Sequence, residues 1–81
     1  MTIVVYGKVD CSLCEKANAI LQHLRREFDF DIEHIDITAD PRLFRRYHEK
    51  IPVLTVDGRE IAWGIVTIVN LRSAVKRLLV K

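Results

Sequence analysis

The spacing of apolar and polar residues along the chain predicts alternating strands and helices. An unbroken apolar run, Ile3-Val4-Val5-Tyr6, ends at Gly7 and is typical of a central strand of a parallel sheet, covered on both faces. The next segment has a period of 3.6 and predicts a helix, with Ser12 as a candidate cap. Its apolar stripe comprises Leu13, Ala17, Ile20, Leu21, Leu24 and Phe28.

A second strand is predicted from Phe30 to Ile37, where apolar and charged residues alternate. The alternation slips at His34-Ile35, so we expect a bulge or an irregular end there. The polar content of the segment indicates an edge strand. Together with the first strand and helix it forms a βαβ unit, whose crossover is nearly always right-handed.

Asp40-Pro41 predicts the start of a short helix, with Asp as the cap and Pro at the first helical position. The apolar residues Leu43, Phe44 and Tyr47 form its predicted buried stripe. The helix must end before Ile51-Pro52, because a residue that precedes proline avoids the α region.

The last part of the chain predicts a hairpin and a helix. Asp57-Gly58 is a strong hairpin signal between the strands Val53 to Val56 and Arg59 to Trp63. Thr67 is the expected cap of the final helix. The apolar face of that helix comprises Ile68, Leu71, Val75, Leu78 and Leu79, and its basic end comprises Lys76, Arg77 and Lys81. The order is β-α-β-α-β-β-α, and we expect residues 1–81 to form one α/β domain.

Composition and charge narrow the function classes. The chain is 49% hydrophobic and 30% charged, and its net charge of +2 is too small to indicate nucleic-acid binding. The longest apolar stretch, Ile61 to Val69, is interrupted by Gly64 and Thr67 and is too short to span a bilayer. Met1-Thr2 runs straight into the first strand, so we expect no leader peptide and a cytoplasmic, reducing location.

Both cysteines of the chain, Cys11 and Cys14, lie between the first strand and the first helix. In a reducing compartment such a pair is more often redox-active or metal-binding than structural. Their spacing places them on one face of the first helical turn, where a disulfide is allowed, with Cys11 toward solvent and Cys14 more enclosed. Helix N-termini lower the pKa of a thiol; Lys8 and Lys16 favour the thiolate, whereas acidic neighbours oppose it, so a modest depression is expected.

The segment Tyr6-Gly7-Lys8-Val9-Asp10-Cys11-Ser12-Leu13-Cys14 resembles the glutaredoxin pattern Tyr-Ser-Lys-x-x-Cys-Pro-Tyr-Cys. Ile51-Pro52-Val53-Leu54 is similar to the cis-proline strand of that family, and the hairpin follows in the expected place. The element order resembles the thioredoxin fold in its minimal form, a four-stranded mixed sheet with flanking helices. The closest likeness is to small glutaredoxin-like proteins that also carry a Trp at the end of the last strand.

The resemblance implies a thiol–disulfide oxidoreductase that reduces disulfides of proteins or small molecules. Cys11 would attack and Cys14 would resolve the mixed disulfide. Pro52 would be cis, and the backbone of Ile51 would pair with an extended substrate. Lys8 matches the lysine that contacts the glycyl carboxylate of glutathione. Arg45 or Arg46 is a weaker candidate for that contact.

The chain also departs from the glutaredoxin pattern. Glutaredoxins hold the γ-glutamyl end of glutathione with a Gly-Gly-x-x-Asp segment, but here the stretch is Trp63-Gly64-Ile65-Val66-Thr67. Lys50 replaces the Thr before the cis-proline pair, Leu13 replaces Tyr, and no Trp precedes Cys11 as it would in thioredoxin. Because the chain has no reductant of its own, electrons would come from glutathione or from a reductase. We expect a monomer with no bound cofactor and no membrane or nucleic-acid partner.

Several alternatives remain open from the sequence. The cysteine pair would be inert in a redox-dead relative, Pro52 would be an ordinary trans proline, and Lys8 would be a solvated loop residue. A metal or iron–sulfur carrier would use the same cysteines, although His23, His34 and His48 lack zinc-finger spacing and are expected on the surface. A non-catalytic peptide-binding module is a further alternative. Trp63 is expected to be a core or rim aromatic, and Arg42, Arg45 and Arg46 the wet face of a short helix.

Overall fold

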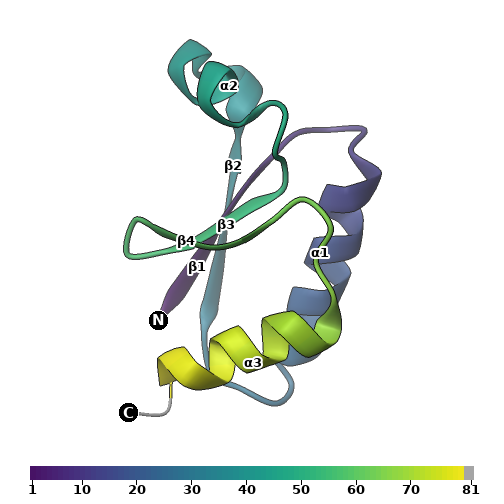
Figure 1. The fold of residues 1–81 in the computed structure, drawn as a ribbon, viewed down its shortest axis with the longest axis vertical. Helices are drawn as coiled ribbons and strands as arrows, with labels where there is room; N and C mark the ends of the chain where they lie inside the picture. The colour runs from purple at the N-terminus through teal and green to yellow at the C-terminus, as the bar shows by residue number, and fades with distance from the viewer. Residues whose placement is uncertain (80–81) are drawn as a thin grey trace.

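The computed structural model describes residues 1–79, and its elements follow the predicted order (Figure 1). They are β1 (Thr2–Gly7), α1 (Ser12–Leu24), β2 (Asp31–Asp36), the 3₁₀ turn η1 (Ile37–Ala39), α2 (Pro41–Tyr47), β3 (Val53–Val56), β4 (Arg59–Trp63) and α3 (Ile68–Leu79). Lys81, assigned to the basic end of the last helix, lies outside the described residues.

The four strands form one mixed sheet with the order β2-β1-β3-β4. β1 pairs parallel with β2 and antiparallel with β3, and β3 pairs antiparallel with β4. The predicted central position of β1 and edge position of β2 are both confirmed. The four-stranded mixed sheet with three flanking helices is a thioredoxin-like fold.

The two faces of the sheet are covered unequally. α1 and α3 pack on one face, where Ile3, Val5 and Leu54 meet Leu21 and other helix residues in the main core. On the opposite face, α2 and η1 cover only the end of the sheet near Tyr6 and Val53. The ring centroids of Tyr6 and Tyr47 are 4.8 Å apart there. The sequence predicts that both faces of the sheet are covered. In the structure both faces are covered at one end of the sheet only, the end where α2 lies in Figure 1.

Three of the predicted caps and turns are confirmed. The carboxylate of Asp40 accepts the Arg42 N–H at 2.8 Å, and the hydroxyl of Thr67 accepts the Asn70 N–H at 3.2 Å. Asp57 and Gly58 have φ values of 51° and 80°, as a type I′ hairpin turn requires. These features could be predicted because each depends on a hydrogen bond or backbone conformation that involves only neighbouring residues in the chain.

Other predicted details are wrong. α1 ends at Leu24, and Phe28 reaches the core from the turns that follow the helix. β2 pairs with β1 in an unbroken register, so the bulge expected at His34-Ile35 is absent, and the register shift lies between β3 and β4 at Leu54/Thr55. Phe44 is exposed and stacks on His48 with the ring centroids 4.9 Å apart. The short α2 has too little of the sheet beneath it to bury its whole apolar stripe.

An ion pair joins the turn after α1 to α3. Arg72 donates to both carboxylate oxygens of Glu27, with the shortest contact at 2.8 Å. The hydrogen bond from Arg72 holds the pKa of Glu27 below its ordinary value of 4.5. Because the folded state lowers this pKa, the stabilisation is complete above the unfolded pKa and is lost as the pH falls through the folded pKa.

The Glu27→Gln variant is therefore expected to unfold at lower urea concentration than the parent at pH 7. The two midpoints should converge as the pH is lowered below about 4, where the parent carboxylate also becomes neutral. Urea titrations at several pH values measure this difference. The control is Glu33→Gln on the exposed face of β2. A gap between Glu27→Gln and the parent that is independent of pH would contradict the ion-pair account.

Candidate active site

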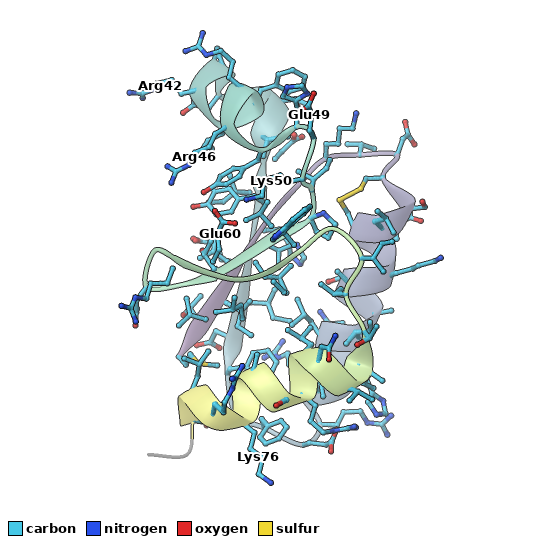
Figure 2. The ribbon with its side chains drawn as sticks, in the orientation of Figure 1. Arg42, Arg46, Glu49, Lys50, Glu60 and Lys76 are labelled. Atoms are coloured by element: carbon cyan, nitrogen blue, oxygen red, sulfur yellow. A yellow bond between two sulfur atoms is a disulfide. The ribbon has the colours of Figure 1, made fainter. Side chains whose placement is uncertain are left out.

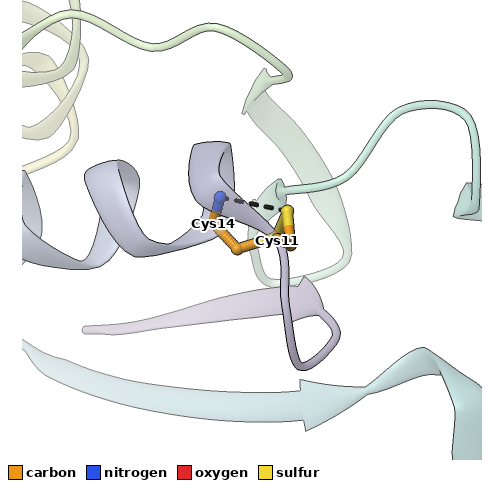
Figure 3. The surroundings of a disulfide bond; sticks show 2 residues. All are labelled: Cys11 and Cys14. Atoms are coloured by element: carbon orange, nitrogen blue, oxygen red, sulfur yellow. Dashed lines mark hydrogen bonds between the residues drawn. A yellow bond between two sulfur atoms is a disulfide. The ribbon is translucent and has the colours of Figure 1, made fainter.

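The two cysteines lie at the start of α1, where the chain leaves β1 and turns back over the sheet. Asp10, with a φ of 59°, makes the turn, and Cys11 is extended with φ −116° and ψ 105°. The Sγ atom of Cys11 accepts the backbone N–H of Cys14 at 3.2 Å (Figure 3). Cys11 is thus the cap of α1, and the prediction of Ser12 in that role is wrong.

A disulfide joins Cys11 and Cys14, whose Cα atoms are 5.2 Å apart. This confirms the expectation that their spacing permits a disulfide. Both side chains are partly buried. Cys14 also faces the sheet, because a Cβ atom built on Gly7 would lie 3.1 Å from its Sγ atom. Gly7 therefore leaves the space that the sulfur of Cys14 occupies.

Sequence reasoning did not assign Gly7 to the site. Its signal was the small residue at the end of β1, in the position where the glutaredoxin pattern has Ser. A side chain there would need the sulfur of Cys14 to move, since real Cβ atoms rarely come so close to a neighbour. The residue that ends β1 thus helps to determine where the second cysteine lies.

Pro52 lies beside this pair. β1 and β3 are antiparallel with Tyr6 opposite Val53, and continuing that register places Pro52 opposite Gly7. Figure 3 shows the segment that enters β3 beside the disulfide. The Ile51-Pro52 peptide bond is cis, as the resemblance implies, and Pro52 is fully buried.

The backbone around Pro52 is only partly engaged. The carbonyl oxygen of Pro52 accepts the N–H of Gly64 at 2.8 Å. Within residues 1–79, the N–H and C=O groups of Ile51 make no hydrogen bond. The side chain of Ile51 packs on the smaller core with Tyr47 and Val53. The described residues thus offer no hydrogen-bond partner to the backbone of Ile51.

A cavity of about 330 Å³ lies beside Cys14. Its lining includes Gly7, Lys8, Cys14, Glu15 and Asn18, together with residues at the carboxyl end of β2. Lys8 is exposed at this cavity. Ile51 and Pro52 do not line it. The structure thus groups Lys8 and Gly7 with Cys14 at the cavity, while Ile51 and Pro52 lie outside its lining.

Lys50, directly before Ile51, is fixed in position by β4. Its ammonium lies 2.7 Å from the carboxylate of Glu60 and 5.1 Å from the centre of the Trp63 ring. Figure 2 shows Lys50 and Glu60 close together between α2 and the β3–β4 hairpin. Trp63 is 56% exposed, so it is a rim aromatic rather than a core residue. This cluster could not be predicted from the sequence, because its members are far apart in the chain.

The remaining candidates lie on the surface. Arg45 and Arg46 are exposed on α2, and the guanidinium of Arg46 lies 5.2 Å from the centre of the Tyr47 ring. His23, His34 and His48 are exposed, as expected. In the part of the chain that is described, no three His, Cys, Asp or Glu side chains gather as a metal site would require. Nor does any helix within residues 1–79 have the length and apolar character needed to cross a membrane.

The mixed sheet, with a disulfide at the start of α1 next to a cis-proline at the start of β3, places the chain among the thioredoxin-like folds. Residues 2–77 match the model of the glutaredoxin-like domain family (DUF836). The chain therefore belongs to the glutaredoxin-like domain family.

Solved structures show the same fold. Protein XcR50 from X. campestris superposes with a TM-score of 0.81, at 26% identity over 93% of this chain and 96% of that one. Protein Ne2328 from Nitrosomonas europaea has a TM-score of 0.76 and is 31% identical over 89% of this chain and 87% of its own. E. coli glutaredoxin shares the fold with a TM-score of 0.62, at 23% identity over 98% of each chain.

Proposed function

We propose that this protein is a thiol–disulfide oxidoreductase in which Cys11 and Cys14 form the redox pair. The observation that carries the proposal is the hydrogen bond from the Cys14 N–H to the Sγ atom of Cys11, at the N-terminus of α1. After reduction the same N–H and the partial positive charge of the helix end favour the thiolate form of Cys11. Cys11 is thus the nucleophile and Cys14 the resolving thiol.

The proposed reaction moves two electrons to the substrate. The thiolate of Cys11 attacks one sulfur of a substrate disulfide, and the other sulfur leaves as a thiolate. The thiolate of Cys14 then attacks the Sγ atom of Cys11 and releases the second substrate sulfur. The protein is left with the Cys11–Cys14 disulfide, and the substrate with two thiols.

Substrate placement rests on Ile51 and Pro52. The N–H and C=O groups of Ile51 are without partners within residues 1–79, and Pro52 lies opposite Gly7 beside the cysteines. An extended segment that pairs with Ile51 brings its disulfide to Cys11 by strand addition. The proposed substrates are disulfide-containing proteins or small molecules, and the protein acts as a cytoplasmic monomer without a bound cofactor.

The electron donor is proposed to be glutathione or a reductase. In place of the Gly-Gly-x-x-Asp segment of glutaredoxins, this chain has Ile65, which is 80% exposed, after Gly64. An apolar side chain offers no hydrogen bond to the polar end of glutathione. Comparing turnover coupled to glutathione with turnover coupled to a thioredoxin reductase distinguishes the two donors.

The Cys14→Ser variant tests the assignment of the resolving thiol. It is expected to accumulate a mixed disulfide on Cys11, because the thiol that releases the substrate is gone. Mass spectrometry after incubation with a model disulfide measures this adduct. The control is Ser12→Ala, an exposed neighbour in the same helical turn, which should turn over without accumulating it. Turnover by Cys14→Ser at the parent rate without an adduct would contradict the assignment.

A further inference from the structure

We infer that Asn18 positions the thiol of Cys14 in the reduced protein by accepting a hydrogen bond from it, and thereby favours the reduced form of the pair. This inference rests on the proposed redox function and adds a positioning residue to it. Asn18 lies in α1, four residues after Cys14. A buried carbonyl oxygen without a partner thus lies on the same helix face as the proposed resolving cysteine.

The side-chain oxygen of Asn18 is buried without a hydrogen bond. Among residues 1–79, it is the only buried side-chain nitrogen or oxygen atom that has no hydrogen-bond partner. Buried polar atoms are nearly always paired, because an acceptor removed from water without a new partner destabilises the state that contains it. The structure holds the Cys11–Cys14 disulfide, so the unpaired oxygen belongs to the oxidised state.

The helix brings Asn18 next to Cys14. Residues four apart in an α-helix lie one above the other on the same face, with their Cβ atoms about 5–6 Å apart. Helical side chains also lean toward the N-terminal end of the helix, so that of Asn18 leans over the turn that contains Cys14. Both residues line the same cavity of about 330 Å³. A proton that reduction places on the Cys14 sulfur is thus close to an acceptor that has no other partner.

Reduction supplies the missing donor. A disulfide sulfur carries no proton, whereas a thiol donates one weak hydrogen bond. The Sγ atom of Cys14 is packed against the sheet, because a Cβ atom built on Gly7 would lie only 3.1 Å from it. Water is therefore a poor partner for the new thiol, and the oxygen of Asn18 is the acceptor that its own helix provides.

The other polar side chains of the cavity do not need the thiol as a partner. Lys8, Glu15, His34 and Asp36 line the cavity too, but all four residues are exposed, so that water can satisfy them. Of the described side chains in this cavity, it is the buried oxygen of Asn18 that gains a partner when Cys14 acquires a proton.

Reduction by a dithiol such as dithiothreitol transfers two electrons to the pair. The bond between the two sulfurs breaks, the dithiol closes into a cyclic disulfide, and its two protons pass to the protein thiols or to solvent. One proton stays on Cys14 and is donated to Asn18. The oxidised state thus carries an unpaired oxygen and the reduced state a hydrogen bond, and both differences move the equilibrium toward the reduced pair.

The Asn18→Leu variant tests this effect, because leucine is close to asparagine in size and has no acceptor. Its equilibrium with mixtures of reduced and oxidised dithiothreitol is expected to shift about fivefold or more toward the oxidised protein. Acid quenching, alkylation of free thiols and mass spectrometry measure the reduced fraction.

The matched control is Gln22→Leu, the same change from amide to leucine at an exposed position of α1, about two turns from Cys14. It should shift the equilibrium by no more than about twofold. An unchanged equilibrium in Asn18→Leu, or an equal shift in Gln22→Leu, overturns the inference.

The Asn18→Asp variant separates the acceptor from the packing of the side chain. Aspartate keeps an oxygen in the same place, and a carboxylate accepts a stronger hydrogen bond than an amide. Its equilibrium should therefore lie within about twofold of the parent or further toward the reduced protein. A shift toward the oxidised protein as large as that of Asn18→Leu would assign the effect to packing and overturns the inference.

The hydrogen bond itself is visible in the infrared spectrum, because the S–H stretching band moves to lower frequency when the thiol donates. In Cys11→Ser, Cys14 is the only thiol of the chain. The band is expected at lower frequency in Cys11→Ser than in Cys11→Ser combined with Asn18→Leu, and equal frequencies overturn the inference. If dithiothreitol does not reduce the parent pair, the proposed function itself fails; normal reduction with equal equilibria in the parent and Asn18→Leu defeats only this inference.

Discussion

Replacing Cys11 with serine is expected to lower the rate of disulfide reduction at least about a thousandfold. A serine hydroxyl is not ionised at neutral pH and cannot form the mixed disulfide. The initial rate with a model disulfide at saturating reductant measures the loss. Because Cys11 also caps α1 through its sulfur, far-UV circular dichroism should accompany the assay to show that the helix persists.

Two comparisons make this result decisive. Ser12→Ala changes the next residue, which is exposed and is not the cap, and should keep the parent rate within about twofold. Retained reductase activity in Cys11→Ser would contradict the mechanism. If instead the parent itself is inactive and its absorbance after anaerobic purification reveals a cluster, the alternative of a metal or cluster carrier replaces the oxidoreductase. Binding of a peptide without turnover would favour the recognition module.

Truncating Leu54 to alanine is expected to lower the free energy of unfolding by about 2–5 kcal/mol. Leu54 is fully buried in β3, paired with Val5 on one side and Ala62 on the other. It lies in the main core beneath α1 and α3, so the cavity left by truncation is enclosed by secondary structure on several sides. For a domain of this size, such a loss is a large share of the total stability.

Urea unfolding of the oxidised proteins measures this loss. The control is Val69→Ala, whose parent side chain is 70% exposed and should change stability by no more than about 0.5 kcal/mol. Equal midpoints for Leu54→Ala and the parent would show that the core is not centred on β3. A large loss of stability in Val69→Ala would contradict the exposure of this side chain in the structure.

The fold was predictable because its signals are local. Asp40, Asp57-Gly58 and Thr67 each mark an element boundary through a contact or backbone conformation within a few residues. The predicted boundaries that are wrong depend on competition between continuing a helix and ending it in turns. Phe28 continues the apolar stripe of α1, yet Glu27 and Phe28 both donate to the carbonyl of Leu24 in the turns that end the helix. The spacing of apolar residues does not reveal where the helix changes to turns.

The site was predictable in part. The Cys11–Cys14 pair and the cis-proline could be predicted from a family pattern whose residues keep their spacing. The sequence did not reveal the close approach of Gly7 to Cys14, because that contact depends on how α1 sits over the sheet. It assigned the cap to Ser12 by residue preference, although the sulfur of Cys11 accepts the hydrogen bond. Three-dimensional packing decides both points.

The tether of Lys50 to β4 has a consequence for substrate affinity. The ammonium of Lys50 lies 2.7 Å from the carboxylate of Glu60 in β4, and the carbonyl of Pro52 accepts the N–H of Gly64, just after β4, at 2.8 Å, so the residues on both sides of Ile51 contact β4 or the residue that follows it. An incoming segment that pairs with Ile51 then meets a preorganised partner. The entropy lost on binding falls mainly on the substrate. If substrates bind by the proposed strand addition at Ile51, segments that are already extended should bind more tightly than loosely ordered ones.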